Sequence, residues 1–136
     1  MKSTLRYATF VVLAHAGVAY WHLFLCLKIC PALQQVLLNV AVLNFAPLVA
    51  LVLLWQHSPR LGGLLLGLAL AAGLYAGSVE HFLDPGPFNV FHLAATKWAL
   101  PFQVTVILLP VLQVLGCWVA IQSFRGVPLL KAKAEQ

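Results

Sequence analysis

Acidic residues are nearly absent from this chain, which has three Asp or Glu against eight Lys or Arg in 136 residues. Charged residues make up only 8% of the sequence, hydrophobic residues make up 62%, and the mean hydropathy is +0.96. A chain of this length and composition leaves no room for a water-soluble domain beside its apolar segments. Because the basic residues flank those segments, the net charge of +5 does not indicate nucleic-acid binding.

Cysteines and catalytic motifs are also scarce. Three cysteines are too few for a disulfide framework, and we expect Cys26, Cys30 and Cys117 to be packed thiols, although a Cys26–Cys30 bridge is conceivable if the helix frays before Pro31. The sequence has no phosphate-binding loop, no dinucleotide fingerprint and no His-Glu-x-x-His motif. These absences favour a protein that is not an enzyme.

Four apolar stretches are each long enough to cross a hydrocarbon core, which requires roughly 20 residues. They cover residues 5–28, 33–55, 61–83 and 98–124. The stretches are continuously apolar, whereas the strands of a membrane barrel alternate, so helices are favoured. Because the connections are short, neighbouring helices should run antiparallel. The sequence therefore predicts an all-α membrane protein, a single domain (1–136) folded as a compact antiparallel bundle of four transmembrane helices.

The distribution of basic residues predicts the orientation in the membrane. Two of them, Lys28 and Lys97, fall on one side. The other six fall on the opposite side: Lys2, Arg6, Arg60, Arg125, Lys131 and Lys133. Since cytoplasmic loops carry the excess of Lys and Arg, both termini and the short tail 125–136 are expected in the cytoplasm. The amphipathic loop 84–97 is then expected on the outer membrane surface.

The third apolar stretch carries a row of small residues. Ala69, Gly73 and Gly77 repeat every four residues, a spacing that lets membrane helices approach one another closely. We therefore expect this helix at the packed centre of the bundle. The same row continues to His81, which places His81 on a side that faces protein and not lipid.

Five ionisable residues gather toward the outer end of the bundle: His22, Glu80, His81, Asp84 and His92. Ionisable groups at membrane depth are costly unless they are paired, hydrated or coordinated, so this cluster is the default functional site. With a rise of about 1.5 Å per residue, the helical members lie roughly 5 to 9 Å below the outer end, at the level of Asn39 and Gln103. The inner half has few polar residues, which predicts a blind pocket open to the outside and not a channel.

All five residues are candidate ligands of a transition metal, because imidazole and carboxylate suit zinc, copper, iron or nickel. Cys26, four residues from His22, could add a thiolate. Glu80 and His81 are adjacent, so both can reach one ion only if the helix end is distorted, and the stop at Pro85 could supply this distortion. His22 and His81 are alternatively the best pair of axial ligands for a haem.

Three other interpretations stay open. The polar side chains could simply form hydrogen bonds between helices, each contributing about 0.6 kcal/mol. The chain could be a non-catalytic accessory or assembly subunit, with other membrane subunits or copies of itself as partners besides the lipid bilayer. The outer pocket could also bind a small lipophilic ligand such as a quinone, with His22 or Glu80 bonded to its polar end.

Overall fold

The computed structural model describes residues 2–33, 40 and 44–125, which fold into helices joined by turns and one longer loop. Three helices are long and apolar enough to cross a membrane: α1 (Lys2–Ile29), α4 (Pro59–Ser78) with its extension η2 (Val79–Leu83), and α5 (Ala99–Arg125). A further helix, α3 (Ala46–Trp55), has 10 residues and is too short to span by itself. The three long apolar helices indicate an integral membrane protein.

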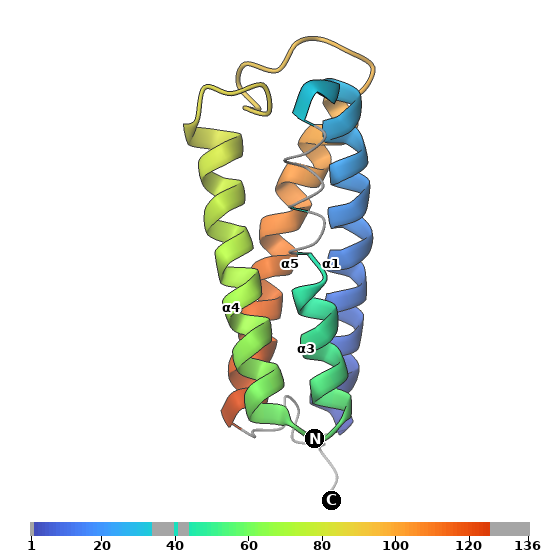
Figure 1. Ribbon diagram of the computed structural model, residues 1–136, viewed down its shortest axis with the longest axis vertical. Helices are drawn as coiled ribbons and strands as arrows, with labels where there is room; N and C mark the ends of the chain where they lie inside the picture. Colours follow the sequence, from blue (N-terminus) through green and yellow to red (C-terminus); the bar gives the residue numbers. More distant parts are fainter. Residues whose placement is uncertain (1, 34–39, 41–43, 126–136) are drawn as a thin grey trace, which may run out of the picture.

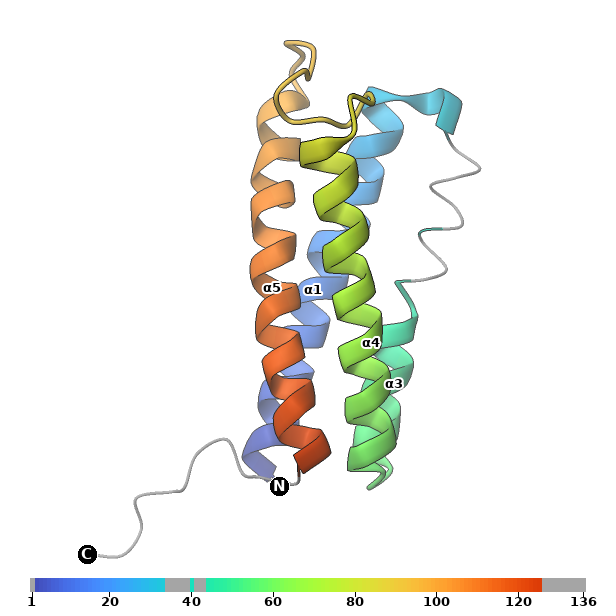
Figure 2. The ribbon, with the colours of Figure 1, turned by 90° about the vertical axis from the view of Figure 1, so that its left-hand side faces the viewer.

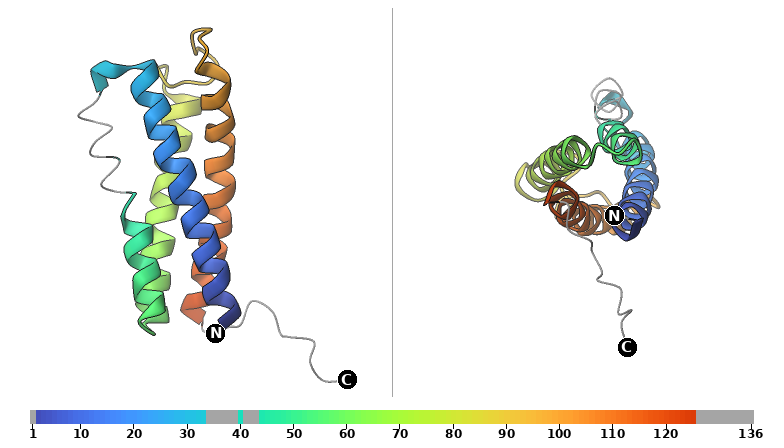
Figure 3. Two further views of the ribbon diagram at one scale, coloured as in Figure 1. Left: turned by 90° about the vertical axis from the view of Figure 1, so that its right-hand side faces the viewer. Right: turned by 90° about the horizontal axis from the view of Figure 1, so that it is seen from below.

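The helices run side by side along one axis. α1 and α4 run in one direction, and α3 and α5 run in the other (Figure 1). Viewed along the axis, they surround a common centre in the order α1, α3, α4, α5, so that each helix contacts two neighbours (Figure 3). The start of α1 and the end of α5 lie together at what we call the terminal end (Figure 2). The opposite end, which carries loop 84–97, is the loop end.

The second predicted span is only partly described, and it differs from the prediction. A continuous helix was expected over 33–55, yet a turn at Asn44 and Phe45 separates α3, which begins at Ala46, from the helical residue Val40. The break has a local cause, because Pro47 lacks a backbone N–H and fits best in the first turn of a helix. Most of the residues before this turn lie outside the described part of the chain, as does Asn39.

Two clusters of buried apolar side chains form the core, and they lie at different heights. The cluster toward the terminal end joins all four helices and contains Ala8, Val11, Val12, Ala50, Leu51, Leu54, Leu66, Leu70, Val119 and Ala120. The cluster toward the loop end contains Leu23, Leu25, Cys26, Phe88, Phe102 and Val106. The second cluster is the one that surrounds the polar residues, because His22 lies on α1 among its members.

Helices α4 and α5 approach closely where glycine replaces a side chain. A Cβ added to Gly63 would lie 2.8 Å from the carbonyl oxygen of Ala120 and 2.9 Å from the backbone nitrogen of Phe124. Backbone atoms cannot move aside as the tip of a flexible side chain can, so only glycine fits at this position without separating the helices. Close packing of small residues was expected on this helix, and it occurs at Gly63. Ala69, Gly73 and Gly77, the row from which it was expected, instead line a cavity.

We predict that Gly63→Ala destabilises the bundle, because the added methyl group meets the backbone of α5. Overpacking of this kind costs about 1–3 kcal/mol. Thermal unfolding in detergent, followed by circular dichroism, measures the change. Gly67→Ala is the matched control one turn along α4, since its Cβ would make an ordinary 3.4 Å contact with the Cβ of Ala120. Equal unfolding temperatures for the two variants would contradict the prediction.

Candidate functional site

The distortion at the end of the third membrane segment is the first element of the site. After α4 the chain forms one turn of π-helix, η2, closed by a 2.8 Å bond from the backbone nitrogen of Asp84 to the carbonyl oxygen of Val79. Wide turns of this type are rare and occur frequently at functional sites. Within η2 the side chain of His81 is buried, whereas the adjacent Glu80 is exposed. These two adjacent residues therefore have different surroundings.

Two histidines from different membrane segments meet at this turn. The ring centroids of His22 on α1 and His81 on η2 lie 4.9 Å apart, edge to face. Phe102 on α5 stacks on His22 with a centroid distance of 4.9 Å and lies nearly perpendicular to the ring of His81 at 5.5 Å. Three segments thus contribute one ring each to a single contact, and all three side chains are buried.

A chain of hydrogen bonds fixes the tautomer of His22 when its ring is neutral. The Thr105 hydroxyl donates its only hydrogen to the carbonyl oxygen of Phe102, at 2.7 Å. That hydroxyl must therefore accept from Nδ1–H of His22, which lies 2.8 Å away. The other ring nitrogen, Nε2, is then an acceptor, and it lies 3.5 Å from Sγ of Cys26, whose thiol donates to it. Both nitrogens of His22 are occupied by the protein.

The same reasoning assigns the tautomer of neutral His81, with a different result. Its Nδ1 lies 3.2 Å from the carbonyl oxygen of Phe88, and since a carbonyl can only accept, Nδ1–H is the donor. The lone pair of the ring is then on Nε2. No described residue donates a hydrogen bond to this nitrogen, so His81 retains an acceptor for another molecule.

Loop 84–97 folds back over the helix ends and places the Phe88 carbonyl. Val90 donates its backbone N–H to the carbonyl oxygen of His81 at 3.0 Å, so His81 holds the loop at two points. Asn89 is 2% exposed and donates its side-chain amide to the carbonyl oxygen of Asp84 at 2.8 Å. The loop was expected on the membrane surface. Its first half instead inserts Phe88 into the core beside Phe102.

A cavity of about 350 Å³ lies beside the histidine pair, between α1, the start of α3, α4 with η2, and α5. Its walls are mostly Ala, Gly, Val, Leu and Pro. The polar side chains that line it are His15, His22, Asn44, Ser78, Glu80, His81 and Gln113. His15 is only 2% exposed, and neither of its ring nitrogens has a partner among the described residues. Both nitrogens are themselves buried, and a buried polar group without a partner costs about 1–3 kcal/mol, so a hydrogen bond to His15 would be favourable.

The structure brings some of the predicted site residues together and separates others. His22 and His81 are in contact, and Glu80, although exposed, lines the same cavity. Asp84 and His92 are exposed in the loop and do not line it. Among the residues that the structure describes, no group of three or more His, Cys, Asp and Glu is placed to hold a metal ion.

The geometry of the histidine pair also bears on the haem hypothesis. Axial ligation requires the metal between two imidazoles that approach it from opposite faces. Here the rings contact each other directly, and both nitrogens of His22 are hydrogen-bonded to protein. This arrangement leaves no space for a macrocycle between them. Metal and haem binding therefore stay predictions from the sequence.

Sequence reasoning missed several residues that build the site. Thr105 was only one sparse polar residue in an apolar run, yet it orients His22. Phe88 and Asn89 are buried although they belong to the loop. The local sequence does not indicate this burial, because it depends on how the chain turns back after the π-helical turn. Gln113 has such a signal, since an amide in the middle of an apolar helix requires a polar neighbour or cavity.

Comparison of the chain with known protein families, with curated proteins and with solved structures gives no match. A functional assignment therefore has to rest on the geometry and chemistry of the cavity itself.

We predict that Thr105→Val leaves Nδ1–H of His22 without its acceptor. The side chains have similar shapes, so the loss is chiefly that of the hydroxyl, and the free energy of unfolding should fall by about 1–3 kcal/mol. Nitrogen-15 NMR of the imidazole would report the change at Nδ1. Thr105→Ser keeps the hydroxyl and should preserve the wild-type signal. An unchanged His22 signal in Thr105→Val would show that the assigned hydrogen-bond chain is wrong.

Proposed function

We propose that this protein binds a small lipophilic molecule with a hydrogen-bonding head group, of the quinone type, in the cavity beside His22 and His81. The cavity volume falls within the range of small-molecule sites, which are typically about 300–1,000 Å³. Mostly apolar walls with a few fixed polar groups are also typical of such sites. The bilayer would supply the ligand directly.

The observation that carries this proposal is the unsatisfied imidazole of His15 in the cavity wall. A neutral imidazole offers one N–H donor and one acceptor, and His15 uses neither within the described part of the chain. Its N–H suits a quinone carbonyl. The acceptor at Nε2 of His81 suits a hydroxyl, such as that of the reduced quinol.

The spacing of the polar groups favours a ligand with polar atoms on both sides of an apolar body. His15 lies seven residues before His22 on one face of α1, about 10 Å along the helix axis, and His81, which contacts His22, carries the free acceptor Nε2. Small and apolar residues, among them Ala19 and Gly73, line the wall around them. A quinone ring carries carbonyl oxygens on opposite sides, so it can bond at one end and extend its apolar part along this wall.

Two other functions stay predictions. Metal binding is not favoured, because no three His, Cys, Asp or Glu side chains among the described residues are placed to hold one ion. An accessory role in a larger complex agrees with the small size of the chain, but no feature of the cavity calls for a partner protein. The hydrogen-bonding interpretation accounts for His22, whose nitrogens are satisfied, and it does not account for His15.

We further propose that the chain crosses the membrane four times. α1 and α4 run in the same direction. If both span the membrane, the chain must cross back between them, and α3 forms the half of that crossing that is nearer the terminal end. Arg6, Arg60 and Arg125 lie at the terminal end, which by the excess of basic residues is the cytoplasmic one. The cavity would then lie toward the extracytoplasmic side.

Replacement of His15 should separate stability from binding. His15→Leu removes the unpartnered polar group, so we expect a higher unfolding temperature together with a weaker affinity for a short-chain alkyl-benzoquinone. Loss of one hydrogen bond of about 1.4 kcal/mol corresponds to about a tenfold weaker affinity. Isothermal titration calorimetry on the purified protein in detergent measures the affinity.

His92→Ala is the matched control, because His92 lies outside the cavity and should change neither quantity. Elemental analysis of the same samples tests the metal hypothesis, which predicts bound metal that is lost in His92→Ala. Absence of quinone binding by the wild type, or equal affinities for the wild type and His15→Leu, would overturn the proposed function.

Cysteine labelling tests the proposed orientation. In a Cys30→Ser background, His92→Cys should react with a membrane-impermeant maleimide on intact cells. Gln56→Cys, in the turn after α3, should react only after the cells are opened, because that turn is expected in the cytoplasm. If only Gln56→Cys is labelled on intact cells, the orientation is the reverse of the one proposed. If both variants are labelled on intact cells, the chain does not cross the membrane four times.

A further inference from the structure

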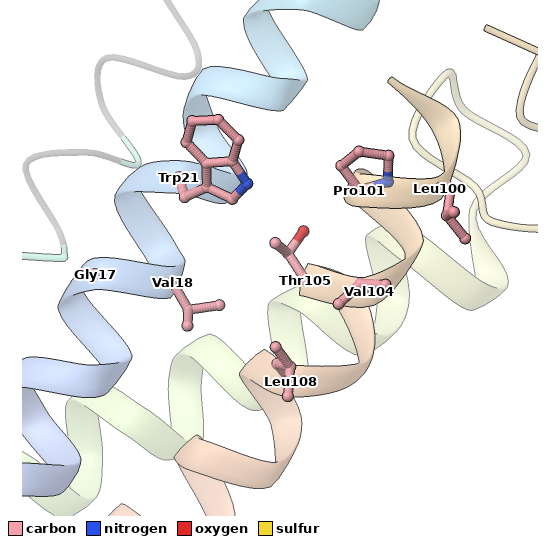
Figure 4. Close-up of a pocket in the computed structure, with 8 residues that line it drawn as sticks. All are labelled: Gly17, Val18, Trp21, Leu100, Pro101, Val104, Thr105 and Leu108. Atoms are coloured by element: carbon pink, nitrogen blue, oxygen red, sulfur yellow. The ribbon is translucent and has the colours of Figure 1, made fainter. Parts of the chain in front are cut away.

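A second hollow lies between α1 and α5, outside the histidine cavity. It has a volume of about 490 Å³, and its lining is almost entirely apolar. Gly17, Val18 and Trp21 of α1 face Pro101, Val104 and Leu108 of α5 across it (Figure 4). A Cβ added to Gly17 would meet nothing within 4 Å, so this side of α1 is open to the surroundings. We call this hollow the α1/α5 groove.

Two lysines near the groove pack against aromatic rings that contact one another. Trp21, which lines the groove, stacks on Phe24 at a centroid distance of 5.2 Å, and Phe24 meets Trp98 edge to face at 6.2 Å. Nζ of Lys28 lies 5.1 Å from the Phe24 centroid, and Nζ of Lys97 lies 5.1 Å from the Trp98 centroid. The rings therefore hold two ammonium groups near the loop end of the groove.

The positive charge of these lysines is not neutralised by the protein. Both side chains are exposed, and neither forms an ion pair with a carboxylate in the described part of the chain. Asp84 and Glu80, the acidic residues at this end, belong to the loop start and to η2 instead. The pair thus offers a site for an anion from outside the chain.

The distance along α1 from the inner end of the groove to Lys28 matches the depth of one leaflet of a bilayer. Gly17, Trp21, Phe24 and Lys28 fall on one face of α1, and the 11 residue steps from Gly17 to Lys28 span about 16 Å. Half of a hydrocarbon core of about 30 Å is about 15 Å. A lipid chain that enters at the level of the lysines would therefore reach Gly17 near the middle of the membrane.

We propose that the α1/α5 groove binds an anionic phospholipid, with one acyl chain along the groove and the phosphate between Lys28 and Lys97. This site is separate from the proposed quinone cavity and does not depend on it. An apolar helix of another protein would fill the groove but would leave the two lysines without a counter-charge. Since a Lys near an anionic lipid surface contributes about a fivefold preference, two of them predict about a 25-fold preference for anionic over zwitterionic lipid.

Fluorescence quenching by brominated lipid tests this proposal on the full chain. A reporter form with Trp55→Phe and Trp118→Phe keeps Trp21 and Trp98, the two tryptophans at the site. It is reconstituted in phosphatidylcholine vesicles that contain either brominated phosphatidylglycerol or brominated phosphatidylcholine. We expect quenching by the anionic lipid at a much lower mole fraction than quenching by the zwitterionic lipid.

Charge variants decide whether the two lysines cause the preference. Replacing both by glutamine, Lys28→Gln with Lys97→Gln, should reduce the ratio of the two affinities to about one, because the expected preference comes from their charge. Arg60→Gln with Arg125→Gln removes the same charge at the terminal end and should leave the ratio unchanged. Gly17→Leu should weaken quenching by both lipids, because its side chain fills the groove.

Two outcomes would overturn the proposal. The first is equal quenching of the reporter form by both lipids. The second is a lipid preference that persists in the double lysine variant. If, in addition, the protein forms a larger assembly in mild detergent that Gly17→Leu disrupts, the groove binds a helix from another chain instead.

Discussion

Polar atoms buried between membrane helices must find their hydrogen-bond partners inside the protein, and this requirement governs the loop end of the molecule. The contact between His22 and His81 brings two buried imidazoles together. Thr105 and Cys26 satisfy one ring, and the carbonyl oxygen of Phe88 satisfies one nitrogen of the other. The tautomers of both rings follow from these hydrogen bonds, and the bonds to His81 also hold the loop in place.

The π-helical turn connects this hydrogen bonding to the shape of the site. Within this turn His81 is buried and Glu80 is exposed, and Val90 donates its backbone N–H to the carbonyl oxygen of His81. The loop thereby covers the histidine pair from above. The cavity lies beside the pair, where His15 and Nε2 of His81 stay without protein partners in the described residues.

Thr105 lies at the boundary between the two hollows of the molecule. Its hydroxyl accepts the hydrogen bond of His22 on the cavity side, and the residue also lines the α1/α5 groove. The two hollows have different chemistry. The cavity has several polar groups in an apolar wall, which suits a ligand with a polar head, whereas the groove is apolar with two cations above it, which suits an anionic lipid. A lipid in the groove would lie against the wall that orients His22.

Composition and hydropathy were sufficient for the class of the protein, because crossing a membrane demands long apolar helices whatever their neighbours are. The sequence thus determined the three long spans, the close approach of small residues on α4 and the gathering of His22 and His81 at one end. The row of small residues also predicted the inward position of His81. The sequence did not determine the break before Ala46, the exposure of Glu80, or the roles of Thr105, Phe88 and His15. Those were decided by the tertiary structure, because hydrogen bonding between distant segments selects which polar side chains are satisfied and which remain open to a ligand.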